Sequence, residues 1–144
     1  MEDRLVEILL VEDNPSDLEL ALHALKKYHI GNSIRVARDG AEALEYLFSD
    51  DMTMHQRQLR LVLLDLKLPK VDGLEVLQRI KSDTRTQSIP VVVMTSSKEE
   101  RDIVESYRLG VNSFITKPVD FAQFTEAIRQ IGLYWVVLNQ PPAV

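Results

Sequence analysis

The sequence predicts an α/β fold in which helices cover both faces of a parallel sheet. Five short apolar runs alternate with five stretches in which apolar residues recur every three or four positions, and this alternation is typical of successive βαβ units. The run Leu61–Leu64 is apolar throughout and leads directly into Asp65. Because the run lacks polar alternation, we expect it to be buried on both faces, like a strand inside a parallel sheet.

Two strand and helix pairs are expected before this central run, with strands at 6–11 and 34–37. Asn14 can cap the helix that follows the first strand, and Pro15 suits its first turn. The apolar stripe of that helix consists of Leu18, Ala21, Leu22 and Leu25. Residues 49–60, after the second helix, show little periodicity, and we interpret them as a surface loop.

Three more pairs complete the expected sheet. Their strands are 61–64, 91–94 and 113–116. Their helices contain the apolar sets Leu74, Leu77 and Ile80; Ile103, Val104 and Tyr107; and Phe121, Phe124, Ile128 and Ile131. Ser96 and Ser97 each precede a glutamate by three residues, which predicts a capping box. Gly110 is expected to end the second of these helices, and Asp120 to cap the third.

The bulk properties narrow the class of protein. With 144 residues, 45% of them apolar, we expect one domain over 1–144, with its core at about 6–138 and a short tail at 139–144. The net charge of −5 argues against direct nucleic-acid binding. The absence of cysteine excludes thiol catalysis and zinc–thiolate sites. We find neither a signal peptide nor an apolar run near the roughly 20 residues of a membrane helix, and we expect a cytoplasmic protein without membrane contact.

Polar residues follow four of the expected strands. They are Glu12 and Asp13, Asp65, Thr95, and Lys117. The carboxyl ends of parallel strands meet at one edge of the sheet, where such folds bind ligands. Three carboxylates there would repel one another, and a divalent cation with hard oxygen ligands, such as Mg²⁺, would relieve the repulsion. A metal, an ammonium and a hydroxyl around Asp65 are what phosphoryl transfer to that carboxylate requires.

These residues occur in motifs that resemble the receiver domain of two-component response regulators over nearly the whole chain. The matching motifs are Glu12-Asp13-Asn14, Asp65 with Leu68-Pro69 and Asp72-Gly73, Thr95-Ser96, and Phe114 with Thr116-Lys117-Pro118. The resemblance implies a flavodoxin-like (βα)5 fold with strand order 2-1-3-4-5. It also implies that Asp65 accepts a phosphoryl group from the phosphohistidine of a sensor histidine kinase.

The resemblance further assigns roles to the site residues. It implies that Mg²⁺ or Mn²⁺ is held by Asp13, Asp65, the backbone carbonyl of Lys67 and, through water, Glu12. It implies that the phosphoryl group is contacted by Lys117, Thr95 and Ser96.

The same resemblance makes Thr95 and Phe114 the switch, and Lys67 and Ser97 positions that tune the phosphoryl lifetime. It implies a cis bond between Lys117 and Pro118.

A narrower likeness concerns the partner. The segment 49–60, the run Asp65–Lys70 and the Trp-containing C-terminus resemble stand-alone cyanobacterial regulators that work with phytochrome histidine kinases. No output domain is expected after the receiver, so the protein would act by docking on a partner or by passing the phosphoryl group on.

The end of the last helix is apolar on all sides. Its residues are Tyr134, Trp135, Val136, Val137 and Leu138. This turn either packs on the core of its own chain or leaves one side exposed as an interface. In the second case, we expect a homodimer formed by the last helix together with the fourth helix and the fifth strand.

Two other functions remain as alternatives. A phosphatase of the haloacid dehalogenase type also forms an aspartyl phosphate, but it needs a carboxylate two residues after the nucleophile, where this chain has Lys67. A receiver-like adaptor would bind partners without phosphorylation. We expect no enzyme acting on a separate substrate, only a phosphoryl acceptor that catalyses its own phosphorylation and slow dephosphorylation.

Overall fold

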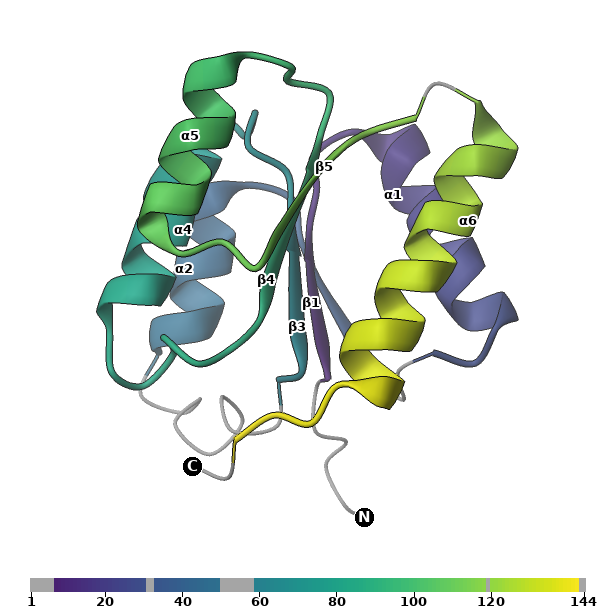
Figure 1. Cartoon of the computed structure of the whole chain (residues 1–144), viewed down its shortest axis with the longest axis horizontal. Coiled ribbons are helices and arrows are strands. Elements are labelled where there is room, and N and C mark those ends of the chain that lie inside the picture. The colour runs from purple at the N-terminus through teal and green to yellow at the C-terminus, as the bar shows by residue number, and fades with distance from the viewer. Residues whose placement is uncertain (1–6, 31–32, 50–58, 119, 143–144) are drawn as a thin grey trace.

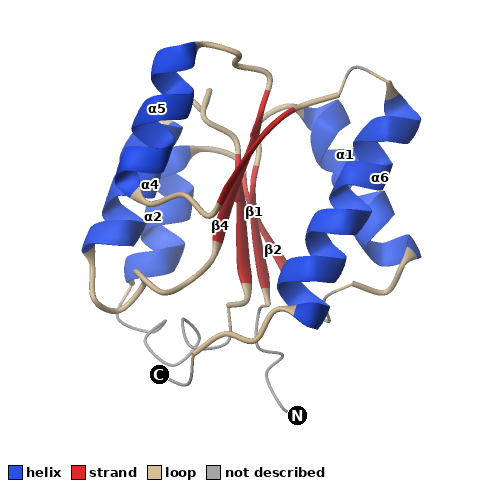
Figure 2. Ribbon diagram, viewed as in Figure 1, coloured by secondary structure: helices blue, strands red, loops and turns tan. Residues whose placement is uncertain are grey.

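The computed structural model describes residues 7–30, 33–49, 59–118 and 120–142. Five parallel strands form one sheet in the order β2-β1-β3-β4-β5, which confirms the predicted order (Figure 2). The strands are β1 (Ile8–Val11), β2 (Ile34–Ala37), β3 (Leu61–Leu64), β4 (Val91–Thr95) and β5 (Ser113–Thr116). The loop was expected over 49–60, and its residues 50–58 lie outside the described residues.

Helices cover both faces of the sheet, as predicted (Figure 1). On one face lie α1 (Pro15–Lys27) and α6 (Phe121–Gly132), and on the other lie α2 (Gly40–Phe48), α4 (Gly73–Ser82) and α5 (Glu100–Leu109). A π-helical turn, η2 (Leu133–Leu138), continues α6. Within the described part of the chain, no helix combines the length and the apolarity of a membrane span.

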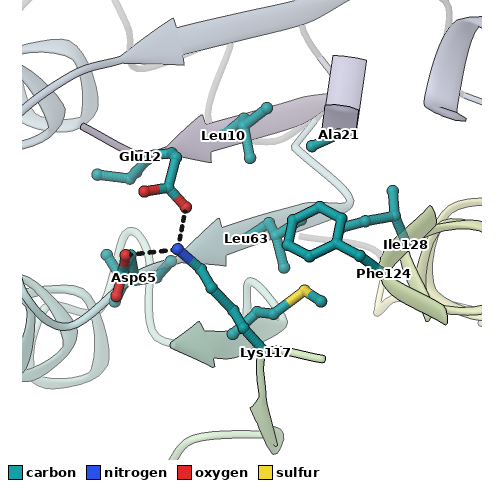
Figure 3. Close-up of a pocket in the computed structure, with 11 residues that line it drawn as sticks. Leu10, Glu12, Ala21, Leu63, Asp65, Lys117, Phe124 and Ile128 are labelled. Atoms are coloured by element: carbon teal, nitrogen blue, oxygen red, sulfur yellow. Dashed lines mark hydrogen bonds and ion pairs between the residues drawn. The ribbon is translucent and has the colours of Figure 1, made fainter. Parts of the chain in front are cut away.

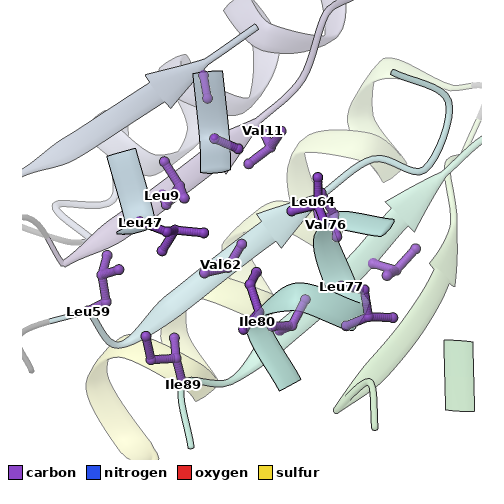
Figure 4. Packing of buried hydrophobic residues seen from close by; sticks show 14 of the residues in the cluster. Leu9, Val11, Leu47, Leu59, Val62, Leu64, Val76, Leu77, Ile80 and Ile89 are labelled. Carbon is purple, nitrogen blue, oxygen red and sulfur yellow. The ribbon is translucent and has the colours of Figure 1, made fainter. Parts of the chain in front are cut away.

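Alternate residues of the central strands point into two separate apolar layers. Leu9, Val62 and Leu64 pack towards α2 and α4, in the layer drawn in Figure 4. Leu10 and Leu63 pack on the opposite face, towards α1 and α6. Burying one such side chain contributes about 1.5–3 kcal/mol. This two-sided burial explains why β3 has no polar alternation, and it fixes the strand whose end presents Asp65.

Most of the predicted helix ends are confirmed. The side chain of Asn14 accepts a hydrogen bond from the Asp17 N–H at 3.0 Å, and Asp120 caps α6 in the same way. Gly110 ends α5 with φ of 100°, a conformation that glycine adopts without strain. The cis bond expected between Lys117 and Pro118 is wrong. None of the peptide bonds between described residues is cis, so this bond is trans.

The start and the orientation of α5 differ from the prediction. The capping box at Ser96 or Ser97 is wrong: Glu99 is the cap residue, and it makes no side-chain capping bond. The Ser97 hydroxyl instead donates to Asp102 at 2.5 Å. Asp102 itself is only 6% exposed.

Of the three apolar residues predicted to face inward on α5, Ile103 is half-buried and the other two point away from the core. Val104 and Tyr107 are 56% and 55% exposed, whereas Asp102 and Ser106 are buried. Phe121, predicted to lie on the inner side of α6, is also exposed.

Gly73 lets the backbone after β3 pass close to α4. A Cβ atom at this position would lie 2.5 Å from both the Asp65 carbonyl oxygen and Leu66 Cα. Both neighbours are backbone atoms, so the loop itself would have to move. We predict that Gly73→Ala lowers the free energy of unfolding by about 1–3 kcal/mol, as overpacking does.

Urea unfolding of the two proteins measures this difference. Gln78→Ala, at an exposed position of the same helix, is the matched control and should change stability by less than about 0.5 kcal/mol. A Gly73→Ala protein as stable as the control would contradict the close packing at Gly73.

Candidate functional site

The side chain of Lys117 lies at the centre of an acidic cluster. The Lys117 N–H donates to the Thr95 carbonyl oxygen at 2.8 Å, which extends the pairing of β5 with β4 and directs the side chain across the carboxyl edge of the sheet. Its ammonium lies 2.8 Å from Glu12 Oε1 and 2.9 Å from Asp65 Oδ2, as Figure 3 shows. The three groups therefore meet although they follow β1, β3 and β5.

Apolar side chains beside this cluster bury its charged groups and shift their pKa values. Leu10, Leu63 and Phe124 lie on one side of the charged groups and line the same pocket (Figure 3). Burial, which disfavours a charged carboxylate, raises the pKa of Glu12 from 4.5 to about 7. The hydrogen bond from Lys117 opposes this rise, and the charge of Asp65 adds to it.

Lys117 responds in the opposite direction. Burial alone would lower its pKa, but hydrogen bonds to Asp17 and Glu12 and the charge of Asp65 outweigh burial and raise the pKa. The ammonium therefore stays charged at neutral pH, as a fixed cation beside Asp65.

Carboxylate oxygens of Glu12, Asp13 and Asp65 lie within 4.8 Å of one another. Asp13 is exposed, whereas Glu12 and Asp65 are 5% and 6% exposed, so the cluster opens to solvent on one side. Hard oxygen ligands with room for water fit Mg²⁺ or Mn²⁺. The backbone N–H of Lys67 donates to Asp65 Oδ1 at 3.3 Å, which keeps residue 67 beside the cluster; its carbonyl as a metal ligand stays a prediction.

The other predicted site residues lie along the same edge or just behind it. Thr95 is fully buried at the end of β4, and its hydroxyl oxygen accepts a hydrogen bond from the Ser97 N–H at 3.3 Å. Ser96 is exposed. Phe114 is half-buried against the apolar layer that faces α2 and α4. Their roles towards a phosphoryl group stay predictions.

Asp17 belongs to the cluster, and sequence reasoning missed it. Its Oδ2 lies 2.7 Å from the Lys117 ammonium, closer than either of the other two carboxylates. The available signal was its spacing: Asp17 follows Asp13 by four residues, so it is near the amino end of α1 and close to the carboxyl edge of the sheet.

Asp102 was also missed. It accepts the hydrogen bond from Ser97 and lies 3.5 Å from the Lys67 ammonium. No sequence signal pointed to it, because the apolar pattern of α5 predicted a different inward side.

The apolar end of the last helix is divided between core and surface. Val136 is buried, and Trp135 packs on the layer that faces α1 and α6. Tyr134, Val137 and Leu138 are more than half exposed. The segment therefore packs partly on its own core and leaves one side exposed, while its role as an interface stays a prediction.

Comparison with known proteins identifies the family. Residues 8–129 match the response regulator receiver domain. The response regulator Rcp1 of Synechocystis sp. strain PCC 6803 is 38% identical over 94% of this chain and 92% of its own length.

Solved structures agree with this assignment. The phosphorylated cyanobacterial phytochrome response regulator RcpA is 40% identical, with a TM-score of 0.87 over 96% of this chain and 99% of its own. The bacteriophytochrome response regulator AtBRR is 54% identical, with a TM-score of 0.70 over 96% of this chain and 100% of its own. One solved form of Rcp1 binds Mn²⁺. The family match over most of the chain, together with these relatives, shows that this protein belongs to the response regulator receiver domain family, whose members are phosphorylated on an aspartate.

Proposed function

We propose that Asp65 is the phosphoryl acceptor, and that a sensor histidine kinase is the donor. The observation that supports this most directly is the contact between the Lys117 ammonium and Asp65 Oδ2, at 2.9 Å, beside the carboxylates of Glu12 and Asp13. Among these carboxylates, Asp65 follows β3, which lies in the middle of the sheet between β1, the strand before Glu12 and Asp13, and β4, whose last residue is Thr95. It is thus the carboxylate around which cationic and hydroxyl groups can gather.

In the proposed reaction, an oxygen of Asp65 attacks the phosphorus of the kinase phosphohistidine. The new P–O bond forms as the P–N bond breaks, and the imidazole nitrogen leaves with the electron pair. Lys117 holds the charge of the incoming oxygens, while Thr95 and Ser96 offer hydrogen bonds to them. Glu12, Asp13 and Asp65 would hold Mg²⁺ or Mn²⁺, which would neutralise further negative charge on the phosphoryl oxygens.

We further propose that the kinase is of the phytochrome type. RcpA and AtBRR, which are named as phytochrome and bacteriophytochrome response regulators, resemble this chain over almost its full length. The support comes from similarity, and no contact residue of the kinase is assigned.

We also propose that phosphorylation acts through Thr95 and Phe114 on an interface between two copies of the chain. Val137 and Leu138 expose apolar surface on η2, and Val104 and Tyr107 do so on α5. Exposed apolar groups of this size favour association. The homodimer through the last helix, α5 and β5 is the second part of this proposal.

The acceptor assignment predicts a covalent product. Incubation of the wild type with Mg²⁺ and acetyl phosphate should add the mass of one phosphoryl group, stable in acid and labile in base. Asp65→Asn should gain none, because an amide oxygen is too weak a nucleophile. Mass spectrometry of the intact protein measures both.

Two controls accompany this experiment. Asp72→Asn, an exposed aspartate whose side chain makes no capping bond, should be phosphorylated like the wild type, and EDTA should abolish the reaction. A wild type that gains no phosphoryl group from acetyl phosphate or from a phosphorylated histidine kinase would favour the adaptor alternative.

The metal assignment predicts a stability effect. Mg²⁺ should raise the melting temperature of the wild type, because a ligand that binds only the folded protein adds RT ln(1 + [L]/Kd), about 2.7 kcal/mol at a hundredfold excess over Kd. Asp13→Asn removes one ligand and should lose most of this shift. Equal Mg²⁺ shifts in Asp13→Asn and in Asp72→Asn would contradict a role for Asp13 in metal binding.

The homodimer predicts a dependence on one exposed side chain. Val137→Asp places a charge on the apolar surface of η2 and should turn dimers into monomers in sedimentation velocity, with and without acetyl phosphate. Gln123→Asp, an exposed position in the first turn of α6, is the control. A wild type that is monomeric at high micromolar concentration in both states would rule the dimer out.

A further inference from the structure

Asp102 connects the loop after β3 with the loop after β4, and both loops contain residues proposed to take part in phosphorylation. It lies in the first turn of α5 and is only 6% exposed. One of its oxygens, Oδ2, accepts the Ser97 hydroxyl at 2.5 Å and lies 3.5 Å from the Lys67 ammonium. Lys67 belongs to the loop after β3, and Ser97 to the loop after β4. A single buried carboxylate oxygen therefore connects these loops.

The same two loops are tied to the centre of the site by backbone groups. The Lys67 N–H donates to Asp65 Oδ1, and the Ser97 N–H donates to Thr95 Oγ1, each at 3.3 Å. Asp102 thus completes a series of contacts that runs from Asp65 through Lys67 and Ser97 to Thr95. Asp65 and Thr95 are the residues proposed to carry and to contact the phosphoryl group.

The Lys67 side chain is the most exposed part of these contacts. It is 54% exposed, and lysine is a compact charge on a flexible stem. A phosphoryl group on Asp65 would bring about 1.5 to 2 negative charges and three strong acceptor oxygens to within a few residues of it. The phosphoryl group and Asp102 therefore compete for one cation.

We propose that Asp102 is a positioning residue that holds the Lys67 ammonium away from the phosphoryl group and thereby shortens the lifetime of phosphorylated Asp65. The inference rests on the proposed function of Asp65. In hydrolysis, a water oxygen forms a bond to phosphorus while the bond from phosphorus to the Asp65 oxygen breaks. The carboxylate leaves with the electron pair, and the water proton passes to solvent.

The attacking water must approach opposite the leaving Asp65 oxygen, from the outer side of the site. An ammonium released from Asp102 would pair with the phosphoryl oxygens and occupy this outer side. It would stabilise the phosphorylated state and obstruct the water. Neutralising Asp102 should therefore slow hydrolysis, and only when Lys67 is present.

The test is a double-mutant cycle on the full chain. Wild type, Asp102→Asn, Lys67→Met and the double variant are phosphorylated with acetyl phosphate, freed of donor, and followed by intact mass. Asparagine keeps an oxygen for the Ser97 hydroxyl. We expect Asp102→Asn to slow loss of the phosphoryl group about two- to fivefold, the range that a partly exposed charge pair contributes. In the Lys67→Met background, the same substitution should change nothing.

Two outcomes overturn the inference while leaving the proposed function intact. One is an Asp102→Asn protein that loses its phosphoryl group at the wild-type rate. The other is a slowing that persists in the Lys67→Met background, which would mean a structural effect of Asp102. A wild type that forms no adduct overturns the proposed function itself.

A measurement on the wild type covers the case in which Asp102→Asn does not fold. The ¹⁵N resonance of the Lys67 ammonium is assigned by its loss in Lys67→Met. It is then followed as Mg²⁺ and beryllofluoride, a phosphoryl mimic, are added. We expect this resonance to stay near its original position because Asp102 retains the ammonium. A large shift, with the pattern of an ammonium bound to the mimic, would contradict the inference.

Discussion

The burial of like charges at one edge of the sheet is the constraint on which this structure depends. β1 and β3 are buried on both faces, and their ends bring Glu12 and Asp65 together in a pocket lined by apolar side chains. Two such carboxylates repel each other, and this repulsion adds to burial, the larger cause, in raising the pKa of Glu12. The Lys117 ammonium offsets this repulsion, and its position depends on β5 pairing with β4. The fold thus assembles a charged site whose carboxylates fit a divalent metal ion.

Much of this arrangement could be predicted from the sequence. The two helical layers and the meeting of Glu12, Asp65 and Lys117 follow from apolar runs that end in polar residues, because parallel strands share one carboxyl edge. The strand order follows from the resemblance to receiver domains. Asp17 and Asp102 could not be assigned in this way. Each lies on a helix, where acidic residues are usually exposed. Its contacts depend on the direction of its side chain, which the periodicity of apolar residues does not predict.

Helix α5 shows why local patterns can mislead. The spacing of Val104 and Tyr107 is typical of an inward stripe, yet both are exposed, while Asp102 and Ser106 lie on the inner side. The buried Asp102 accepts a hydrogen bond from Ser97, so its inward position is compatible with burial. Helix α5 therefore contacts the loops of the site through Asp102 and presents Val104 and Tyr107 on the surface proposed for association.

The central claim is that the phosphoryl group resides on Asp65, and chemical trapping tests it most directly. The chain is phosphorylated by a phosphorylated histidine kinase and reduced with borohydride, which converts an aspartyl phosphate to homoserine, and the peptides are sequenced by mass spectrometry. We predict homoserine at position 65 and aspartate at positions 13 and 17. Homoserine at either of those positions, or a phosphorylated chain with unmodified Asp65, would contradict the account.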